Sequence, residues 1–263
     1  MPDTSKDEVY LELLLAPIRL CADYTPKFGT GASVDLDQFT AAYGADPFYS
    51  WVGLDSPLIY AAHKAAGGIT SIYRQVGIGS ERLFRAIVRD TLGLSAGQAT
   101  WDYEIPNASG GIRKLQLDGR IDLEHVREGD RDRIAEWLEA FKAKLDVQTE
   151  VRGAVFEVRQ GYKSMDSKRQ NADLANAANA YTQRYLPVLA VMSLQLDAAL
   201  RVRYHAAKWG VLSGTITGAD PLSSTYDFMA SVLGYDLRAF FERTSPRIRT
   251  EMASVAKSLL EAK

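Results

Sequence analysis

The chain has 263 residues, of which 46% are hydrophobic and 24% are charged, and its formal net charge is −2. This balance excludes an intrinsically disordered chain, because enough apolar surface is present to bury a sizeable core, most simply as one elaborated domain. It also excludes a simple electrostatic DNA binder, which would usually carry a strongly basic balance. Any nucleic-acid surface is therefore expected to be local.

The expected compartment follows from the cysteine content, from the N-terminal sequence and from the length of the longest apolar run. Cys21 is the single cysteine and cannot form an internal disulfide, which fits a reducing compartment. We expect it to be a small buried apolar residue. The N-terminal sequence MPDTSKDEVY has no cleavable apolar core, and the longest apolar run, 185–196, is far shorter than the roughly 20 residues of a membrane span. We therefore expect a soluble, cytoplasmic protein that does not contact a membrane.

The first 76 residues predict helices and turns. The leucine-rich segment 9–20 predicts a helix that Pro17 limits to its N-terminal part, and it is expected to pack or to form an interface. A later helix is predicted over 57–66 and ends at the glycine pair that begins with Gly67.

A second series of elements begins at Ser80, which is expected to cap a helix with a clear apolar stripe. Glu81 lies in its first turn, where the helix dipole alone explains a carboxylate as well as a role near a metal does. From residue 101 the pattern alternates between apolar and polar residues. It predicts two antiparallel strands, one from residue 101 to about 105 and one over 114–126.

The remaining elements alternate between helices and strands. They are an amphipathic helix over 130–145, a strand over 154–158, a helix over 167–185, a buried strand over 185–195, a helix over 197–207, a strand over 209–215, and helices over 223–233, 237–242 and 246–260. This order is typical of an α/β fold with a mixed central sheet flanked by helices. We expect one domain over 1–263, with its core at about 77–215 and helical elaborations over 1–76 and 216–263.

Acidic residues on the second predicted strand are the first candidates for chemistry. Asp118 and Asp122 share one face of this strand. They are roughly 13 Å apart if the strand is straight, so they cannot bind one ion unless Gly119 permits a bend. Asp122 is the favoured metal ligand because the apolar Ile121 and Leu123 beside it point to the opposite face. Asp118 is a supporting candidate.

A later strand carries an acid and a cation on one face, Glu157 and Arg159. Arginine stabilises developing negative charge but stays protonated and cannot act as a base. Lys163 would point to the same face as Glu157 if the strand continued, but it would then lie roughly 20 Å from Glu157 unless the chain folds back at Gly161. Acidic residues that hold Mg²⁺, with a cation nearby, are what hydrolysis of a phosphodiester requires. Either cation is therefore a catalytic candidate.

Basic and amide residues open the following helix at Lys168, Arg169 and Gln170. Residues 159–169 include four basic residues and one acidic residue, so this segment is locally basic in an otherwise slightly acidic chain. These side chains are candidates for DNA contacts, although capping and solvation of the helix explain them equally well.

The helix with Glu81, the strand GRID that ends at Asp122, and the strand FEVR with Glu157 and Arg159 together resemble the core of the PD-(D/E)XK nuclease superfamily. The segments DGRID and FEVRQGYKSMDSKRQNAD further resemble type II restriction endonucleases, among them the ApaLI-like group. On this resemblance Asp122 matches the aspartate of the motif, Glu157 its glutamate, and Arg159 the position usually held by lysine. Asp118 and Glu81 are further candidate metal ligands.

The sequence departs from the superfamily pattern twice. Ile121 stands where proline is typical, and Arg159 replaces lysine, which keeps Lys163 a candidate for the catalytic cation. The resemblance implies an Mg²⁺-dependent endonuclease that cuts duplex DNA at a short palindrome as a homodimer, with the leucine-rich or C-terminal helices as the interface. The alternatives are a repair or structure-specific nuclease of the same fold, and a catalytically silent protein that binds DNA or another protein.

Overall fold

The computed structural model describes residues 4–29, 31–106, 111–161 and 176–261, and for residues 105, 106 and 113–115 it describes the backbone alone. The chain divides into two compact units. The first, the sheet unit, comprises Met1–Tyr10 and Ser80–Glu242, and the second, the helical unit, comprises Leu11–Gly79 and Arg243–Lys263. The longer segment of the sheet unit begins at Ser80, near residue 77 where the core was expected to start, and ends at Glu242, beyond the expected end at about residue 215.

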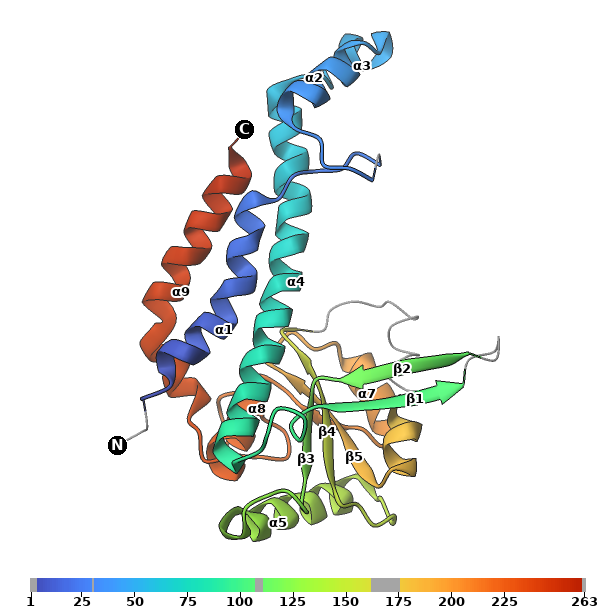
Figure 1. The fold of residues 1–263 in the computed structure, drawn as a ribbon, viewed down its shortest axis with the longest axis vertical. Coiled ribbons are helices and arrows are strands. Elements are labelled where there is room, and N and C mark those ends of the chain that lie inside the picture. Colours follow the sequence, from blue (N-terminus) through green and yellow to red (C-terminus); the bar gives the residue numbers. More distant parts are fainter. Residues whose placement is uncertain (1–3, 30, 107–110, 162–175, 262–263) are drawn as a thin grey trace. The chain divides into compact units, whose positions relative to one another are not determined.

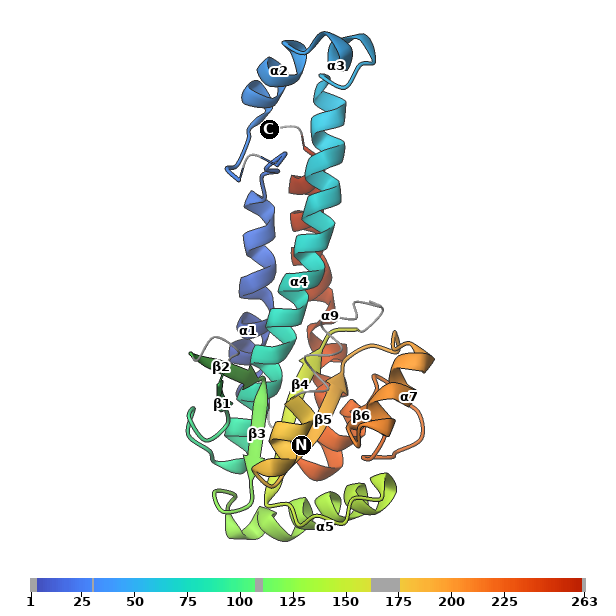
Figure 2. The ribbon, with the colours of Figure 1, turned by 90° about the vertical axis from the view of Figure 1, so that its right-hand side faces the viewer.

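The sheet unit contains a hairpin and a mixed four-stranded sheet (Figure 1). The hairpin pairs β1 (Trp101–Pro106) with β2 (Ile112–Leu117) in antiparallel register. The sheet has the order β3-β4-β5-β6, as Figure 2 shows, and its strands are β3 (Gly119–Asp122), β4 (Gly153–Arg159), β5 (Tyr185–Val191) and β6 (Gly210–Leu212). β3 is antiparallel to β4, whereas β4, β5 and β6 are parallel. The predicted mixed α/β architecture is confirmed.

Helices and aromatic residues cover both faces of this sheet. The predicted amphipathic helix is α5 (Glu128–Leu145), and the five apolar residues of its stripe are buried. Its Trp137 stacks on Phe156 of β4, with ring centroids 6.2 Å apart. Val155 points to the opposite face, because side chains alternate along a strand, and there it joins a second apolar cluster with Trp101 and Trp209. Burial on both faces explains why β4 and β5 are nearly continuous apolar runs.

Further helical segments of the sheet unit are α7 (Ala198–Ala206), the short α8 (Thr225–Asp227) and a π-helical turn (Phe228–Val232). Residues 176–182 are also helical, and the earlier part of the helix predicted over 167–185 lies outside the described residues. Asp197 caps α7 by accepting hydrogen bonds from the N–H groups of Ala199 and Leu200.

The strand predicted over 114–126 is two strands in two different sheets, so that prediction was wrong. β2 ends at Leu117, the chain bends at Asp118, and β3 begins at Gly119. A Cβ atom on Gly119 would lie 3.3 Å from the ring of Phe84, so this tight position favours glycine. The bend separates the hairpin, which pairs with itself, from β3, which pairs with β4.

One helix, α4 (Pro57–Leu92), replaces the two helices predicted over 57–66 and from Ser80, so the predicted stop at Gly67 was wrong. Three of the four glycines inside α4, namely Gly67, Gly68 and Gly79, lie where other segments approach it closely. A Cβ atom at Gly68 would lie 2.6 Å from Cδ2 of Leu259, and one at Gly79 would lie 2.5 Å from the carbonyl oxygen of Leu14. These three glycines therefore serve helix packing rather than helix termination.

Proline residues also fail to end two other helices. α1 (Asp7–Arg19) continues for two residues beyond Pro17. α9 (Leu237–Leu260) runs through Pro246, although two helices were predicted there. A proline removes one hydrogen bond within the helix, and α9 retains buried side chains on both sides of it, among them Phe240 and Leu259.

The leucines of α1 are core residues of the chain. The buried set in the helical unit includes Leu11, Leu14, Leu15 and Ile18, together with Cys21, which is buried as predicted. Ion pairs join α1 to α9 within this unit, where Arg19 contacts Glu251 at 2.9 Å. The helical unit also contains a 3₁₀ turn (Leu20–Asp23), α2 (Leu36–Gly44) and α3 (Pro47–Trp51). Each helix within the described residues is too short or too polar to cross a bilayer.

Candidate active site

Asp118 and Glu157 are brought together at the bend between β2 and β3. The N–H group of Asp118 donates to the carbonyl oxygen of Phe156 at 2.8 Å, and the Asp118 Oδ2 atom accepts from the N–H group of Val158 at 2.8 Å. These two backbone groups flank Glu157 on β4. The carboxylate of Asp118 is thus fixed at the backbone on either side of Glu157, where it satisfies a strand N–H group that β3 does not reach.

Glu157 and Arg159 share one face of β4, as their spacing predicted, and they form an ion pair there. Both side chains are nearly buried. A carboxylate and a guanidinium removed from water offset part of each other's desolvation. The pair therefore places a permanent positive charge next to the candidate metal ligand Glu157, at the end of β4.

Arg85 of α4 is a member of this group that sequence reasoning missed. Its Nε atom donates to the carbonyl oxygen of Asp118 at 2.6 Å, and a terminal nitrogen of the guanidinium lies 4.0 Å from the Asp118 Oδ1 atom. Glu81 precedes Arg85 by four residues, so the two share one side of α4. The spacing E-x-x-x-R on a predicted helix was the signal available in the sequence, but it does not reveal which strand the arginine contacts.

Asp122, the favoured aspartate, does not lie beside Glu157. It is at the other end of β3, where it pairs with Gly153, four residues before Glu157 on β4. Because β3 and β4 are antiparallel, each step along β3 from Asp118 leads away from Glu157. The structure therefore brings Asp118 to Glu157, in place of the expected Asp122. This is the reverse of the expectation that strand geometry favours Asp122 over Asp118.

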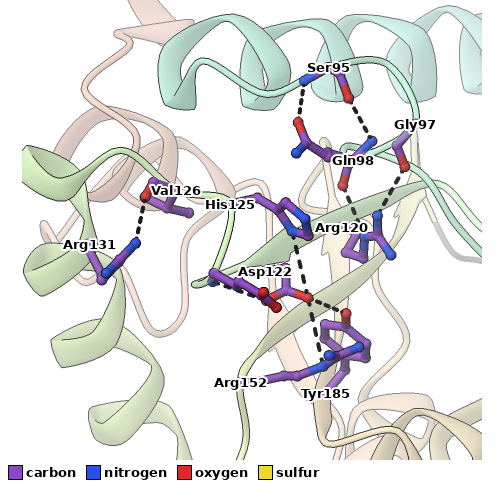
Figure 3. Close-up of polar contacts among 11 residues, drawn as sticks. Ser95, Gly97, Gln98, Arg120, Asp122, His125, Val126, Arg131, Arg152 and Tyr185 are labelled. Atoms are coloured by element: carbon purple, nitrogen blue, oxygen red, sulfur yellow. Dashed lines mark hydrogen bonds and ion pairs between the residues drawn. The ribbon is translucent and has the colours of Figure 1, made fainter.

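Asp122 is instead the buried centre of a separate polar cluster (Figure 3). Its side chain is 2% exposed, and its Oδ2 atom accepts a 2.6 Å hydrogen bond from the hydroxyl of Tyr185. The N–H group of Glu124 donates to the Oδ1 atom at 3.1 Å. Two cationic or titratable side chains lie slightly farther from Oδ2, namely Arg152 with Nε at 3.7 Å and His125 with Nδ1 at 3.9 Å.

The Asp122 cluster has the properties of a structural polar core. The guanidinium of Arg152 lies over the ring of Tyr185, 4.7 Å from its centroid. Burial and the hydrogen bond to Asp122 raise the pKa of Tyr185 to about 12, so its hydroxyl remains a donor at neutral pH. The cluster therefore fastens the start of β4 and β5 to the end of β3 through a satisfied buried carboxylate.

No protein-family model, curated protein or solved structure matches this chain. The candidate site consequently depends on the positions of its own residues. Asp118, Glu157 and Arg159 come from β4 and the bend before β3, while Arg85 and Glu81 come from α4.

The donor set at Asp118 and Glu157 fits Mg²⁺ better than a closed transition-metal site. Among the described residues, no three His, Cys, Asp or Glu side chains are grouped closely enough to hold a metal ion. Magnesium commonly uses one or two carboxylates and keeps several water ligands, so it does not require a third protein acid. The nearby Arg159 and Arg85 reduce the repulsion between these two acids.

Four other predicted site residues, Lys163, Lys168, Arg169 and Gln170, lie outside the described residues. Their expected roles, a catalytic cation for Lys163 and DNA contacts for the other three, stay predictions. Lys163 follows Arg159 by four residues, so the choice between these two cations is a matter for experiment.

The described part of the sheet unit also has a separate charged pocket of about 370 Å³, lined by residues in or next to α1, α4 and α5 and by residues 233–235. Lys6 pairs with Asp90 at 2.8 Å, and Arg133 pairs with Asp130 at 2.7 Å. Burial and the hydrogen bond to Asp90 raise the pKa of Tyr10 above its ordinary value. Because its acids are already matched by cations and a hydroxyl, this pocket is best explained as an ion-pair network that stabilises the fold.

Proposed function

We propose that the protein is an Mg²⁺-dependent endonuclease that hydrolyses phosphodiester bonds in duplex DNA. The observation that carries this proposal is the carboxylate of Asp118, hydrogen-bonded to β4 on the strand edge beside Glu157. In a PD-(D/E)XK-like site, Asp118 then takes the place of the motif aspartate, Glu157 that of the glutamate and Arg159 that of the lysine. This assignment replaces Asp122 by Asp118 and retains the other two residues.

The order of elements supports the same proposal. A helix that bears an acid, a hairpin, a strand antiparallel to the next, and then parallel strands follow each other along the chain as expected for a restriction-endonuclease-like core. The resemblance of DGRID and of the segment that begins FEVR to type II restriction endonucleases adds the expectation of a short palindromic target. A two-fold target is matched most simply by a homodimer.

The roles of the residues follow from their contacts. Asp118 and Glu157 would hold the metal ion, which, when bound, activates a water molecule and neutralises charge on the phosphoryl oxygens. Arg85 positions Asp118 through its carbonyl oxygen. Arg159 fixes Glu157 by the ion pair and presents a positive charge to the phosphate that enters the site. Glu81 on α4 is a further acid on the side of the helix that carries Arg85.

The proposal is tested by incubating the protein with plasmid and phage DNA, with and without Mg²⁺, and mapping the ends. Discrete fragments with identical ends support a restriction endonuclease. Cleavage confined to branched or damaged DNA would assign the protein to repair or structure-specific nucleases of the same fold. A gel shift without cleavage at any Mg²⁺ concentration would overturn the enzymatic proposal and favour the silent DNA-binding alternative, which the arginine at the lysine position also permits.

A further inference from the structure

A row of basic residues lies on the exposed side of α9 within the helical unit. The exposed residues from 243 to 257 define this surface, which we name the α9 face: Arg243, Pro246, Arg247, Arg249, Thr250, Ala253, Ser254 and Lys257. At 3.6 residues per turn their positions span roughly 160° of the helix circumference, so they form one continuous face. The opposite side of α9 is buried at Val255 and Leu259, and Figure 1 shows α9 beside α1 in this unit.

The charged residues of the α9 face are all cations. Between residues 243 and 260 the single acidic residue is Glu251, which lies at the edge of the face and pairs with Arg19 of α1 at 2.9 Å. Arg247 contacts Glu12 at 3.3 Å, and 46% of its side chain remains exposed. The side chains of Arg249 and Lys257 form no ion pair or hydrogen bond with any residue that the structure describes. The face therefore carries uncompensated positive charge.

The exposed side of α5 shows how an ordinary solvated helix surface of this chain is built. It mixes acidic and basic residues, among them Arg131, Asp132 and Glu136. Its charges also pair along the helix, as Lys142 does with Glu139 at 2.8 Å. Mixed signs are the usual arrangement on a soluble surface. The α9 face differs, since its four cations occur without an acid, and this difference indicates an anionic partner.

The composition of the α9 face indicates a polyanion rather than an apolar protein surface or a membrane. Protein interfaces have an apolar or aromatic centre with few charges, whereas no large apolar residue is exposed on α9 between residues 243 and 257. A helix that lies on a membrane must insert its apolar side, and that side of α9 is buried at Val255 and Leu259. For the same reason the α9 face is unsuited to the dimer contact for which the C-terminal helices were a candidate.

The spacing of the cations suits the phosphate backbone of duplex DNA. From Arg243 to Lys257 the face is roughly 21 Å long at 1.5 Å per residue, and each DNA strand carries one phosphate per about 3.4 Å of helix axis. Each cation can therefore meet a different phosphate group. Three of the four cations are arginines, whose planar guanidinium group can bind two phosphate oxygens at once. The residues between them, such as Ala253 and Ser254, are small and let α9 approach the duplex closely.

We propose that the α9 face binds the phosphate backbone of duplex DNA and does so without reading the base sequence. The net charge of −2 implies that any nucleic-acid surface of this chain is local, and the α9 face is such a local surface in the helical unit. The inference deepens the proposed function, and it rests on that function for the choice of DNA as the polyanion. Because phosphate contacts carry no sequence information, the recognition sequence is not needed to test it.

Fluorescence anisotropy of a labelled 30-base-pair duplex tests the proposal, with EDTA present so that no metal-dependent cleavage occurs. Replacement of both Arg249 and Lys257 by glutamine, a good helix former, should weaken binding at 0.1 M salt by roughly tenfold or more. The slope of log K against log salt concentration should fall by about two, or about one for each lost phosphate contact. The control is the pair Arg131→Gln and Lys142→Gln on α5, which removes the same charge and should leave the slope unchanged. Circular dichroism should show both double variants folded.

A cross-linking experiment locates the duplex directly. Cys21 is the single cysteine and is buried, so a cysteine introduced on the surface can be labelled selectively. Ser254→Cys, in the middle of the α9 face, should cross-link to the duplex when it carries a benzophenone group. Ala143→Cys, which is exposed on α5, should not cross-link above background.

Two results would overturn the proposal: a double variant at Arg249 and Lys257 that binds the duplex with the affinity and salt dependence of the wild type, or equal cross-linking from positions 254 and 143. Loss of DNA binding in that variant, beside a wild type that never cleaves DNA with Mg²⁺, would support the α9 face and overturn the nuclease proposal. Cleavage by the wild type, beside a double variant with unchanged DNA binding, would do the reverse.

Discussion

Replacement of Asp118 or Asp122 by asparagine should show which aspartate serves catalysis and which serves stability. In Asp118→Asn the side-chain oxygen can still accept the hydrogen bond from the N–H group of Val158, so the fold should be preserved. The negative charge that would hold the metal is lost. We expect cleavage to fall by roughly 10²–10³-fold or more, the range seen when one group that stabilises transition-state charge is removed, with an unchanged melting temperature.

Asp122→Asn should have the opposite effect. Both oxygens of the buried carboxylate accept hydrogen bonds, Oδ2 from the hydroxyl of Tyr185 and Oδ1 from the N–H group of Glu124. Asparagine has one acceptor oxygen, so one of these bonds is lost, and hydrogen bonds to charged groups contribute about 1.5–3 kcal/mol. At about 2–4 °C per kcal/mol for a unit of this size, the melting temperature should fall by roughly 3–12 °C. Cleavage measured well below that temperature should remain, because Asp122 lies at the far end of β3 from Glu157.

The assay is plasmid cleavage with Mg²⁺ at a temperature where both variants are folded, together with thermal unfolding followed by circular dichroism. A folded Asp122→Asn variant that is inactive, beside an Asp118→Asn variant that cuts normally, would refute the assignment and return the catalytic role to Asp122. Loss of activity in both folded variants would show that the two ends of β3 act together, which the register of the sheet argues against.

Three further outcomes are expected. Gly79→Ala should destabilise the helical unit by about 1–3 kcal/mol in urea unfolding because its Cβ would meet the Leu14 backbone, whereas Gly77→Ala, where a Cβ meets nothing within 4 Å, should be neutral or stabilising. Hydrogen bonds from Arg89, Lys6 and Tyr10 outweigh burial, which opposes ionisation, and lower the pKa of Asp90. Asp90 therefore contributes stability above its ordinary pKa near 4 that is lost as the pH falls through the lowered value, and Asp90→Asn should flatten this part of an acid-unfolding profile. Arg159→Lys should retain cleavage, while Arg159→Gln should lose roughly 10²-fold; an unaffected Arg159→Gln variant would assign the catalytic cation to Lys163.

Periodicity predicted most of the sheet unit correctly because its elements bury regular patterns. The stripe of α5, from Ile134 to Leu145, is buried at the predicted positions. The alternation that begins at Trp101 becomes the hairpin strand β1, and the apolar run that begins at Tyr185 becomes the buried strand β5. In each case the spacing of apolar residues follows the period of a single helix or strand, so the element could be predicted without knowing which distant segments contact it.

The errors arose where a distant segment decides the local structure. Gly67 and Gly79 have the sequence properties of helix ends, but they lie where Tyr24 and Leu14 approach α4, and the sequence does not show that approach. The sequence analysis favoured Asp122 over Asp118 on the assumption that residues 114–126 form one straight strand. The bend at Asp118 and the hydrogen bonds of Asp118 to β4 depend on tertiary structure. They could not be predicted from the alternation of faces along a strand or from the apolar residues beside Asp122.

The antiparallel register of β3 and β4 also explains why the number of residues between Asp118 and Glu157 does not indicate how close they are in space. The connection from β3 to β4 leaves at Asp122 and returns at Gly153, the end of the strand pair away from Asp118 and Glu157. Residues added to or removed from this connection lengthen a loop but leave the two carboxylates in place. A motif search with a fixed gap would therefore miss related chains, and the exposed residues 148–150 after α5 are a site where a reporter domain can be inserted without disturbing Asp118 and Glu157.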